Sequence, residues 1–292
     1  MAVSTKHSRT LKTNRPVKNK LLLSPLALLL LSALFLMVFS CEKNDDNDLG
    51  NTVSSEVGQF ESILTDADNM LGQVWQGDGS IEQRLSSPAG SLESTGCATV
   101  THDTSANSIV IDFGSGCTGL DGRTRAGRIL ISYTGAYFVA GSSHVMTFDA
   151  FYVDGRHIEG VRTITNTGTD NAGNMAWNVQ ATNMRITFSG GNWRTWNSTR
   201  TRTLIGGAGN NNWLDDVYRI NGTGSGSNSN GQSFSAVISS LIRNNSCRWI
   251  TAGSISISPS GKPTRIIDFG SGNCDDQATV SIGNRSVTIT LR

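Results

Sequence analysis

The sequence contains Ile111-Asp112-Phe113-Gly114-Ser115-Gly116-Cys117 and repeats it, with one inserted residue, as Ile267-Asp268-Phe269-Gly270-Ser271-Gly272-Asn273-Cys274. Successive side chains of a β-strand face opposite ways, so Ile111 and Phe113 share one face and Asp112 lies on the other. The Gly-Ser-Gly that follows tolerates positive φ and allows a sharp turn. An earlier cysteine precedes each copy and opens a β-rich run, at Cys97 and at Cys247. The motif therefore predicts two similar cysteine-flanked hairpins.

The spacing of the four cysteines favours a disulfide within each hairpin. Turn-forming residues lie midway between the members of each pair, most clearly at Pro259-Ser260-Gly261-Lys262-Pro263. We therefore predict that Cys97 pairs with Cys117 and that Cys247 pairs with Cys274. Four cysteines allow three connectivities, and four buried free thiols are the alternative.

From residue 93 to residue 292 the chain consists of short alternating runs separated by Gly, Asn and Asp, and we find no helical period there. Asp154-Gly155 and Gly283-Asn284 are two-residue hairpin signals, and strands joined by short turns pair antiparallel. The segment Gly222–Gly231 is interpreted as a long flexible hairpin loop. The candidate strands are Ala98–Asp103, Ser108–Phe113, Arg125–Phe138, Val145–Asp154, His157–Thr165, Met175–Ala181, Arg185–Phe188, Arg194–Ile205, Val217–Ile220, Ser233–Ser239, Cys247–Ser258, Thr264–Phe269, Ala278–Ile282 and Ser286–Leu291.

The segment 51–92 contains a helical pattern. Its apolar residues recur at steps of three and four, which places them on one stripe of an α-helix, whereas Glu61, Asp66 and Asp68 fall outside that stripe. Because the polar face lacks Lys and Arg, packing on the protein's own sheet is favoured over membrane binding. The predicted fold is mainly β: a large antiparallel curled sheet or half-barrel meander with one packed N-terminal α-helix. A two-sheet sandwich is the alternative.

Residues 1–40 have the features of a signal peptide. Six Lys or Arg residues precede an apolar run from Leu21 to Phe39, and Val38-Phe39-Ser40-Cys41 resembles the lipobox of bacterial lipoproteins. In that family the cysteine is lipidated after cleavage, so the resemblance implies that acyl chains such as palmitate attach at Cys41. The chain is similar in this respect to uncharacterised surface lipoproteins of Gram-negative bacteria. An uncleaved membrane anchor is the alternative.

Residues 41–50 form an acidic segment without a core and are interpreted as a solvated tether. The resemblance implies a lipid-anchored protein of the outer membrane and cell envelope, exposed at the cell surface or facing the periplasm. Subtracting the six basic leader residues from 24 leaves 18 against 23 acidic residues, a formal −5. This charge disfavours nonspecific binding to nucleic acid.

Two groups of side chains are candidates for ligand binding. Trp193, Trp196 and Trp213 lie near turns, where exposed tryptophans stack on sugars and buried ones seal a core. Arg200 and Arg202 share a strand face with Trp196 and can hold an acidic group. Cross-strand pairing with carboxylates is the alternative for these arginines, as it is for Arg123, Arg125, Arg128 and Arg194.

No catalytic constellation, metal site or cofactor motif is evident. His102, His144 and His157 lack zinc-ligand spacing, and Asp215-Asp216 and Asp275-Asp276 do not belong to an EF-hand pattern. The sequence therefore predicts a non-enzymatic structural or binding module of the envelope. Two alternatives remain, a glycan-binding surface protein and a carrier of an apolar ligand inside the curled sheet. Its partners would be the membrane through Cys41 and a glycan or an envelope protein.

Overall fold

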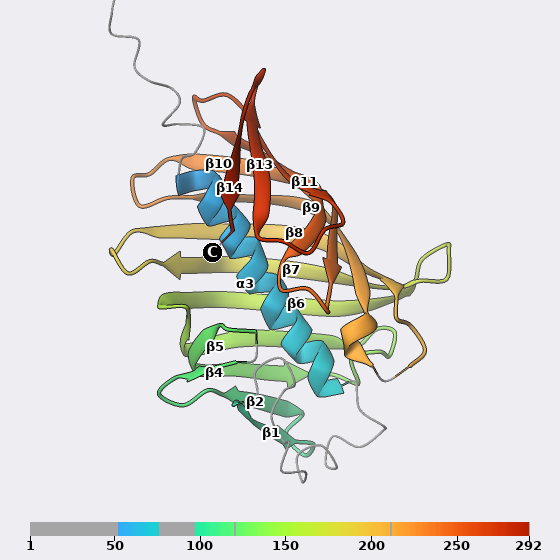
Figure 1. Ribbon diagram of the computed structural model, residues 1–292. Helices are drawn as coiled ribbons and strands as arrows, with labels where there is room; N and C mark the ends of the chain where they lie inside the picture. Colours follow the sequence, from blue (N-terminus) through green and yellow to red (C-terminus); the bar gives the residue numbers. More distant parts are fainter. Residues whose placement is uncertain (1–51, 76–96, 120, 211, 292) are drawn as a thin grey trace, which may run out of the picture. The chain divides into compact units, whose positions relative to one another are not determined.

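The computed structural model describes residues 52–75, 97–119, 121–210 and 212–291 (Figure 1). Every described residue belongs to one compact unit, which lies within Asp46–Arg292. The predicted leader, lipidation site and tether lie outside the described residues. In the described part, one α-helix, α3 (Thr52–Trp75), precedes a run of β-strands.

The strands agree closely with the alternating runs of the sequence. The candidates Met175–Ala181 and Arg185–Phe188 form one bulged strand, and the short β3 was not predicted. The strands are β1 (Thr99–Asp103), β2 (Ser108–Asp112), β3 (Cys117–Thr118), β4 (Thr124–Tyr133), β5 (Ser143–Val153), β6 (Arg156–Thr169), β7 (Met175–Thr187), β8 (Trp193–Gly206), β9 (Val217–Ser227), β10 (Ser233–Asn244), β11 (Ile250–Pro259), β12 (Arg265–Ser271), β13 (Gln277–Ile282) and β14 (Arg285–Thr290).

All fourteen strands belong to one antiparallel sheet, which confirms the predicted fold class and excludes the two-sheet sandwich. The strand order follows the sequence from β1 to β14, except that β3 pairs only with β4. The sheet is open, because β1 and β14 are its two edges in the part of the chain that the structure describes. Such nearest-neighbour pairing is what short hairpin turns dictate.

Helix α3 lies across the strands, and its length shows that the sheet is curled. Its 24 residues span about 36 Å at 1.5 Å per residue. Twelve steps between neighbouring strands would cover about 58 Å in a flat sheet. Yet Trp75 contacts His102 of β1, and Gly58 lies beside Leu291, directly after β14. Both ends of the sheet reach the helix only if the sheet bends around it.

Repeated bulges bend the sheet. Ala150, Asn183 and Ser240 each lie in a β-strand at φ 44–50°, beside a register shift. A glycine of the preceding or following strand lies against each bulge, and any side chain there would collide with the bulge carbonyl. At Gly253, for example, a Cβ would lie 2.3 Å from the carbonyl oxygen of Ser240. An extra residue of this kind increases twist and bends the strand locally.

The interpretation of Gly222–Gly231 as a long loop is wrong, because β9 continues to Ser227. The glycines in this strand make room for large neighbours. A Cβ on Gly224 would lie 2.6 Å from Cζ2 of Trp196, and one on Gly226 would lie 2.0 Å from the carbonyl oxygen of Thr195. The glycines of β9 are therefore required by close packing against the neighbouring strand. From the sequence alone, a strand rich in Gly and Ser looks like a loop.

The two copies of the motif adopt matching structures near the opposite edges of the sheet. Ile111, Phe113, Ile267 and Phe269 are buried, as alternation predicts. In both turns the aspartate accepts a hydrogen bond from a glycine amide two residues later, at 2.7 Å for Asp112 and 2.9 Å for Asp268. The predicted disulfides are confirmed, Cys97–Cys117 with Cα atoms 6.1 Å apart and Cys247–Cys274 with Cα atoms 5.7 Å apart.

Candidate functional site

The face of the sheet that carries α3 is lined by charge as well as by apolar side chains. From Val57 to Val74 the helix is buried on all sides, except for partial exposure of Gln59 and Ser62. Glu61, Asp66 and Asp68 lie outside the apolar stripe, as the sequence predicts, yet all three are buried. Their partners are arginines at inward-facing strand positions, in phase with the apolar residues.

Among the described side chains, Glu61, Asp66 and Asp68 of the helix each form an ion pair with an arginine of the sheet. Arg200 donates two hydrogen bonds of 2.5 Å to the carboxylate of Glu61. Arg162 pairs with both oxygens of Asp68, and Arg125 donates twice to Asp66, at 2.6 and 3.1 Å. The side chains of these arginines are 1% exposed. A buried charge needs such pairing, because desolvation alone would expel it from the core.

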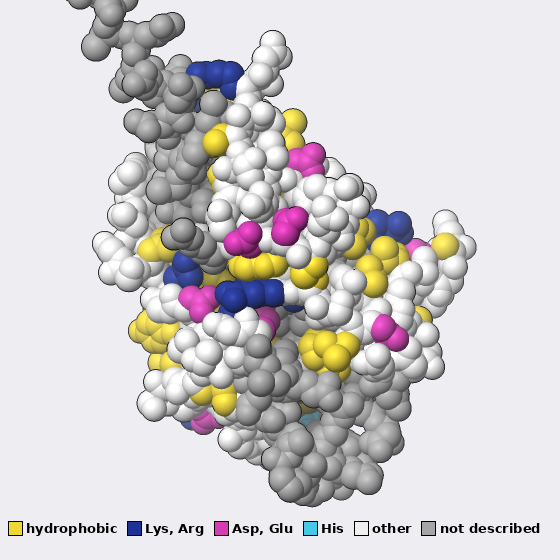
Figure 2. All heavy atoms as spheres, viewed as in Figure 1, with side chains coloured by type: hydrophobic (Ala, Val, Ile, Leu, Met, Phe, Trp, Pro, Cys, Tyr) yellow, Lys and Arg dark blue, Asp and Glu magenta, His cyan; other side chains and the backbone are white. Residues whose placement is uncertain are grey.

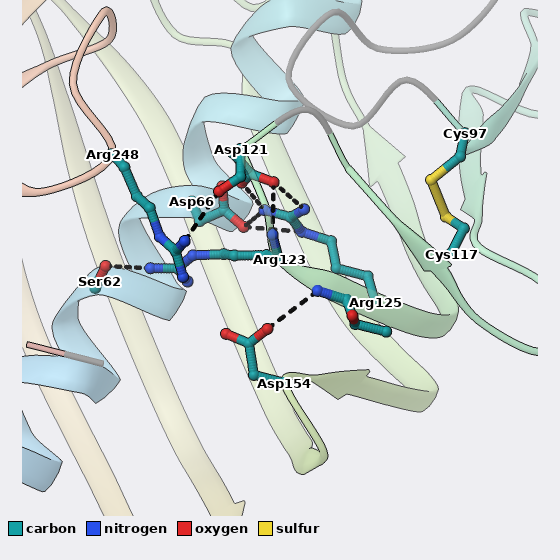
Figure 3. A network of polar contacts seen from close by, with 10 residues as sticks. Ser62, Asp66, Cys97, Cys117, Asp121, Arg123, Arg125, Asp154 and Arg248 are labelled. Atoms are coloured by element: carbon teal, nitrogen blue, oxygen red, sulfur yellow. Dashed lines mark hydrogen bonds and ion pairs between the residues drawn. A yellow bond between two sulfur atoms is a disulfide. The ribbon is translucent and has the colours of Figure 1, made fainter.

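Asp66 belongs to a larger network around Asp121, which Figure 3 shows. Arg125 also binds Asp121, Arg123 donates to Ser62 at 2.5 Å, and Arg248 donates to the carbonyl of Asp121 at 3.0 Å. Burial alone would raise the pKa of Asp66, but the charges of Arg125, Arg123 and Arg243 and the hydrogen bond from Arg125 together outweigh it and hold the pKa below its usual value. Asp66 is thus ionised and already bonded, and the network stabilises the packing of the helix on the sheet.

Charge on the outside of this face is mixed. Figure 2 shows Lys and Arg side chains lying beside Asp and Glu side chains, with no broad field of one sign among the described atoms. The cross-strand alternative holds for Arg128, whose strand partner and ion-pair partner is Asp149. It does not hold for Arg200, which pairs with the helix.

The five residues predicted as ligand-binding do not form one exposed surface. Trp196 is fully buried on the inner face against Phe60, with ring centroids 5.8 Å apart, and Trp213 is 6% exposed. Trp193 lies on the outer face and is half-buried, with the guanidinium of Arg185 4.8 Å from its ring centroid. Arg200 and Arg202 are buried; Arg202 donates to Asn69 and lies 3.6 Å from the ring centroid of Tyr218. These side chains mainly seal the core.

The histidines are engaged in aromatic contacts. His144 is 1% exposed and lies among Trp75, Tyr133 and Tyr137, and burial lowers its pKa to about 4. His102 bonds the hydroxyl of Tyr133 at 2.6 Å, and His157 stacks on Tyr152.

The aspartate pairs named from the sequence make local bonds. Asp215 accepts a hydrogen bond from Asn210, and Asp275 accepts one from the amide of Gln277. Within the described ranges, no three His, Cys, Asp or Glu residues lie close enough to hold a metal ion.

The opposite face of the sheet has a hollow of about 530 Å³ over β7, β8 and β9. Ala181, Ser198 and Gly224, whose side chains point inward or are absent, form its floor. None of its nine lining residues is charged. The outward-facing side chains around it are Gln180, Thr182, Asn197, Thr199, Thr223 and Ser225.

A bulge shapes the hollow. The register of β7 on β8 shifts between Ala181 and Met184, and Asn183 sits there at φ 50°. The amide of Asn183 loses its place in the ladder and donates instead to Oδ1 of Asn197, at 2.8 Å. This bond fixes one wall of the hollow, because it ties the bulge to the neighbouring strand.

Most side chains around the hollow are unengaged. Among the described residues, none of the side chains of Gln180, Thr182, Thr199, Thr223 and Ser225 takes part in a hydrogen bond or ion pair. Sequence reasoning missed this site, because neutral polar residues are ordinary at outward positions of a strand. The available signal was a run of neutral polar residues at outward positions of three consecutive strands, within 178–182, 197–201 and 221–225.

Comparisons with known proteins do not identify the chain: no family model matches it, and neither does any curated protein or solved structure. No helix in the described part of the chain combines the length and apolar character required to cross a membrane.

Proposed function

We propose that this chain is a non-enzymatic binding module of the cell envelope, tethered through a lipidated Cys41, which takes an uncharged polar ligand at the hollow over β7–β9. The lipobox-like sequence supports the tether. The two disulfides support an oxidising location outside the cytosol.

The observation that carries the binding proposal is the hollow itself. Its walls offer hydroxyl and amide groups that no partner in the described structure uses, and a ligand with complementary groups satisfies both sides. A charged ligand would find no counter-ion among the lining residues. The large apolar residues typical of an oily binding site are also missing from the lining.

The other functions predicted from sequence have less support. An apolar-ligand carrier needs space on the concave side of the sheet, and α3 occupies that side with packed side chains. A glycan platform built from Trp193, Trp196 and Trp213 would need exposed rings, and two of the three are buried. Glycan binding by the outer face does not depend on those rings.

One experiment tests the tether. The full-length chain, expressed with its own leader in a Gram-negative host, should partition into detergent and give an intact mass with Cys41 N-terminal and diacylated. Cys41→Ser should prevent both results. A wild-type protein that retains residues 1–40 would overturn the lipid anchor.

A second experiment tests the hollow. The lipidated full-length chain in detergent micelles is mixed with envelope fragments of the host, from which detergent has removed the membrane lipid, and sedimented. Thr199→Arg places a long charged side chain in the hollow and should lower the bound fraction at least fivefold. Thr288→Arg makes the same change at an exposed threonine of β14, away from the hollow, and should leave binding intact. Equal binding by both variants would refute the assignment of the site.

A further inference from the structure

The hollow belongs to a wider array of neutral polar side chains, and the chemistry of that array defines the ligand of the proposed function. The pairing of the strands shows which outward side chains lie opposite one another. Thr163 is opposite Gln180, Gln180 is opposite Thr199, and Thr199 is opposite Thr223, so one row crosses β6, β7, β8 and β9.

Two further rows run parallel to this one. On one side a row crosses the same four strands through Thr165, Asn178, Thr201 and Asn221. On the other side a row crosses β8 to β11 through Asn197, Ser225, Ser235 and Ser258. All twelve residues of the three rows carry a hydroxyl or an amide, and none is charged or aromatic.

The rows repeat at the spacing of the strands, about 4.8 Å. An extended polymer that lies across the strands therefore meets a hydroxyl or an amide at each strand. Four of the twelve side chains already bond within the protein, and the other eight are open to a ligand: the four are Thr165, Asn197, Asn221 and Ser258. Hydroxyls and amides both donate and accept, which matches the hydroxyl groups of a sugar. A protein partner is disfavoured, because the centres of protein interfaces are rich in aromatic residues, Met and Arg.

We infer that the ligand is a neutral polysaccharide, which lies across β6–β9 with its chain seated in the hollow. This inference rests on the proposed function, since it names the ligand of the same site. Each sugar makes a few neutral hydrogen bonds, and the affinity comes from many such contacts along one chain. The site should therefore bind polymers more tightly than short oligosaccharides.

The test uses the full-length protein in detergent and four insoluble neutral polysaccharides: cellulose, chitin, starch granules and a β-1,3-glucan. Depletion from solution gives the affinity for each. Wild type should bind at least one of them. The variant Gln180→Ala/Thr199→Ala/Thr223→Ala removes three groups of the central row and should weaken that binding at least tenfold. These residues are exposed, so a thermal melt should show that the variant remains folded.

The matched control is Ser286→Ala/Thr288→Ala, which removes two exposed hydroxyls of β14 and should bind as wild type does. Binding that the triple variant retains would overturn the inference. If envelope fragments still bind at the Thr199 site while all four polysaccharides fail, the ligand class is wrong and the proposed function stands. If the envelope fragments fail as well, both are wrong.

Discussion

Removal of one partner from the buried pair Glu61–Arg200 should cost more stability than removal of one partner from an exposed pair. The side chains of Glu61 and Arg200 are both 1% exposed, and two hydrogen bonds of 2.5 Å join them. Glu61→Gln removes the negative charge and leaves the Arg200 guanidinium buried. Burial already lowers the pKa of Arg200, and Glu61 is the main group that opposes this effect. Breaking a buried pair from one side costs about 3–5 kcal/mol.

The double variant Glu61→Leu/Arg200→Met distinguishes pairing from packing. It replaces both charges by apolar groups of similar size, and such replacements are roughly neutral. Its free energy of unfolding should therefore lie near that of wild type. Because Glu61→Leu and Arg200→Met should each cost about 3–5 kcal/mol alone, the two changes should couple by about 6–10 kcal/mol. Equilibrium urea unfolding, followed by tryptophan fluorescence with the disulfides intact, gives the free energy of unfolding of wild type, of each single variant and of the double variant.

An exposed pair provides the control. Arg128 and Asp149 have side chains 51% and 43% exposed, and Asp149→Asn should cost less than about 1 kcal/mol. If Glu61→Gln costs no more than this control, the acids of α3 do not anchor the helix. A double variant that is as unstable as Glu61→Gln would show that the packing of the side chains, and not their charges, is what matters.

Three further predictions concern stability. Cys247→Ser/Cys274→Ser opens a loop of 27 residues and should lower the free energy of unfolding by about 3 kcal/mol, measured against the unreduced wild type. The pKa of His144 is about 4 in the folded protein and 6.5 as its ordinary value, so the unfolded chain takes up the proton first as the pH falls. Stability should thus drop by up to about 3 kcal/mol between pH 6.5 and pH 4, and His144→Phe should flatten this profile in urea titrations at each pH; an unchanged profile would refute the assignment. Gly261→Ala, at φ 70° in open space, should cost about 1–2 kcal/mol, whereas Gly253→Ala adds a clash with the carbonyl of Ser240 and should cost clearly more; equal melting temperatures would contradict the bulge argument.

Alternation and turn chemistry predicted most of the sheet. Both act locally, and a meander is built from local pairings, so the strands, the two matching turns and both disulfides followed from short stretches of sequence. The Gly-rich part of β9 was the exception. Its glycines are required by Trp196 and Thr195 on a different strand, and no neighbour in sequence reveals that requirement.

The interior charges could not be predicted for a related reason. The acids beside the apolar stripe of a helix are normally exposed to solvent, and so are the arginines of a strand. In this protein the buried acids of the helix and the buried arginines of the strands neutralise one another. Asp68 and Arg162, for example, pair although 94 positions separate them in the sequence. The one local sign was the phase of Arg200 and Arg202, which share a face with Trp196. The neutral hollow left no sign at all in single residues, because it depends on three strands lying side by side.

The nearest-neighbour order of the strands affects how the chain assembles. Each new hairpin pairs with the edge strand of the sheet already formed, so the sheet can grow as the polypeptide is synthesised. Helix α3 is synthesised first but needs β4, β6 and β8 before its acids find their arginines. Until then, the partly folded sheet exposes arginine guanidinium groups among its apolar side chains. Repulsion between these positive charges on two partly folded chains would oppose their aggregation.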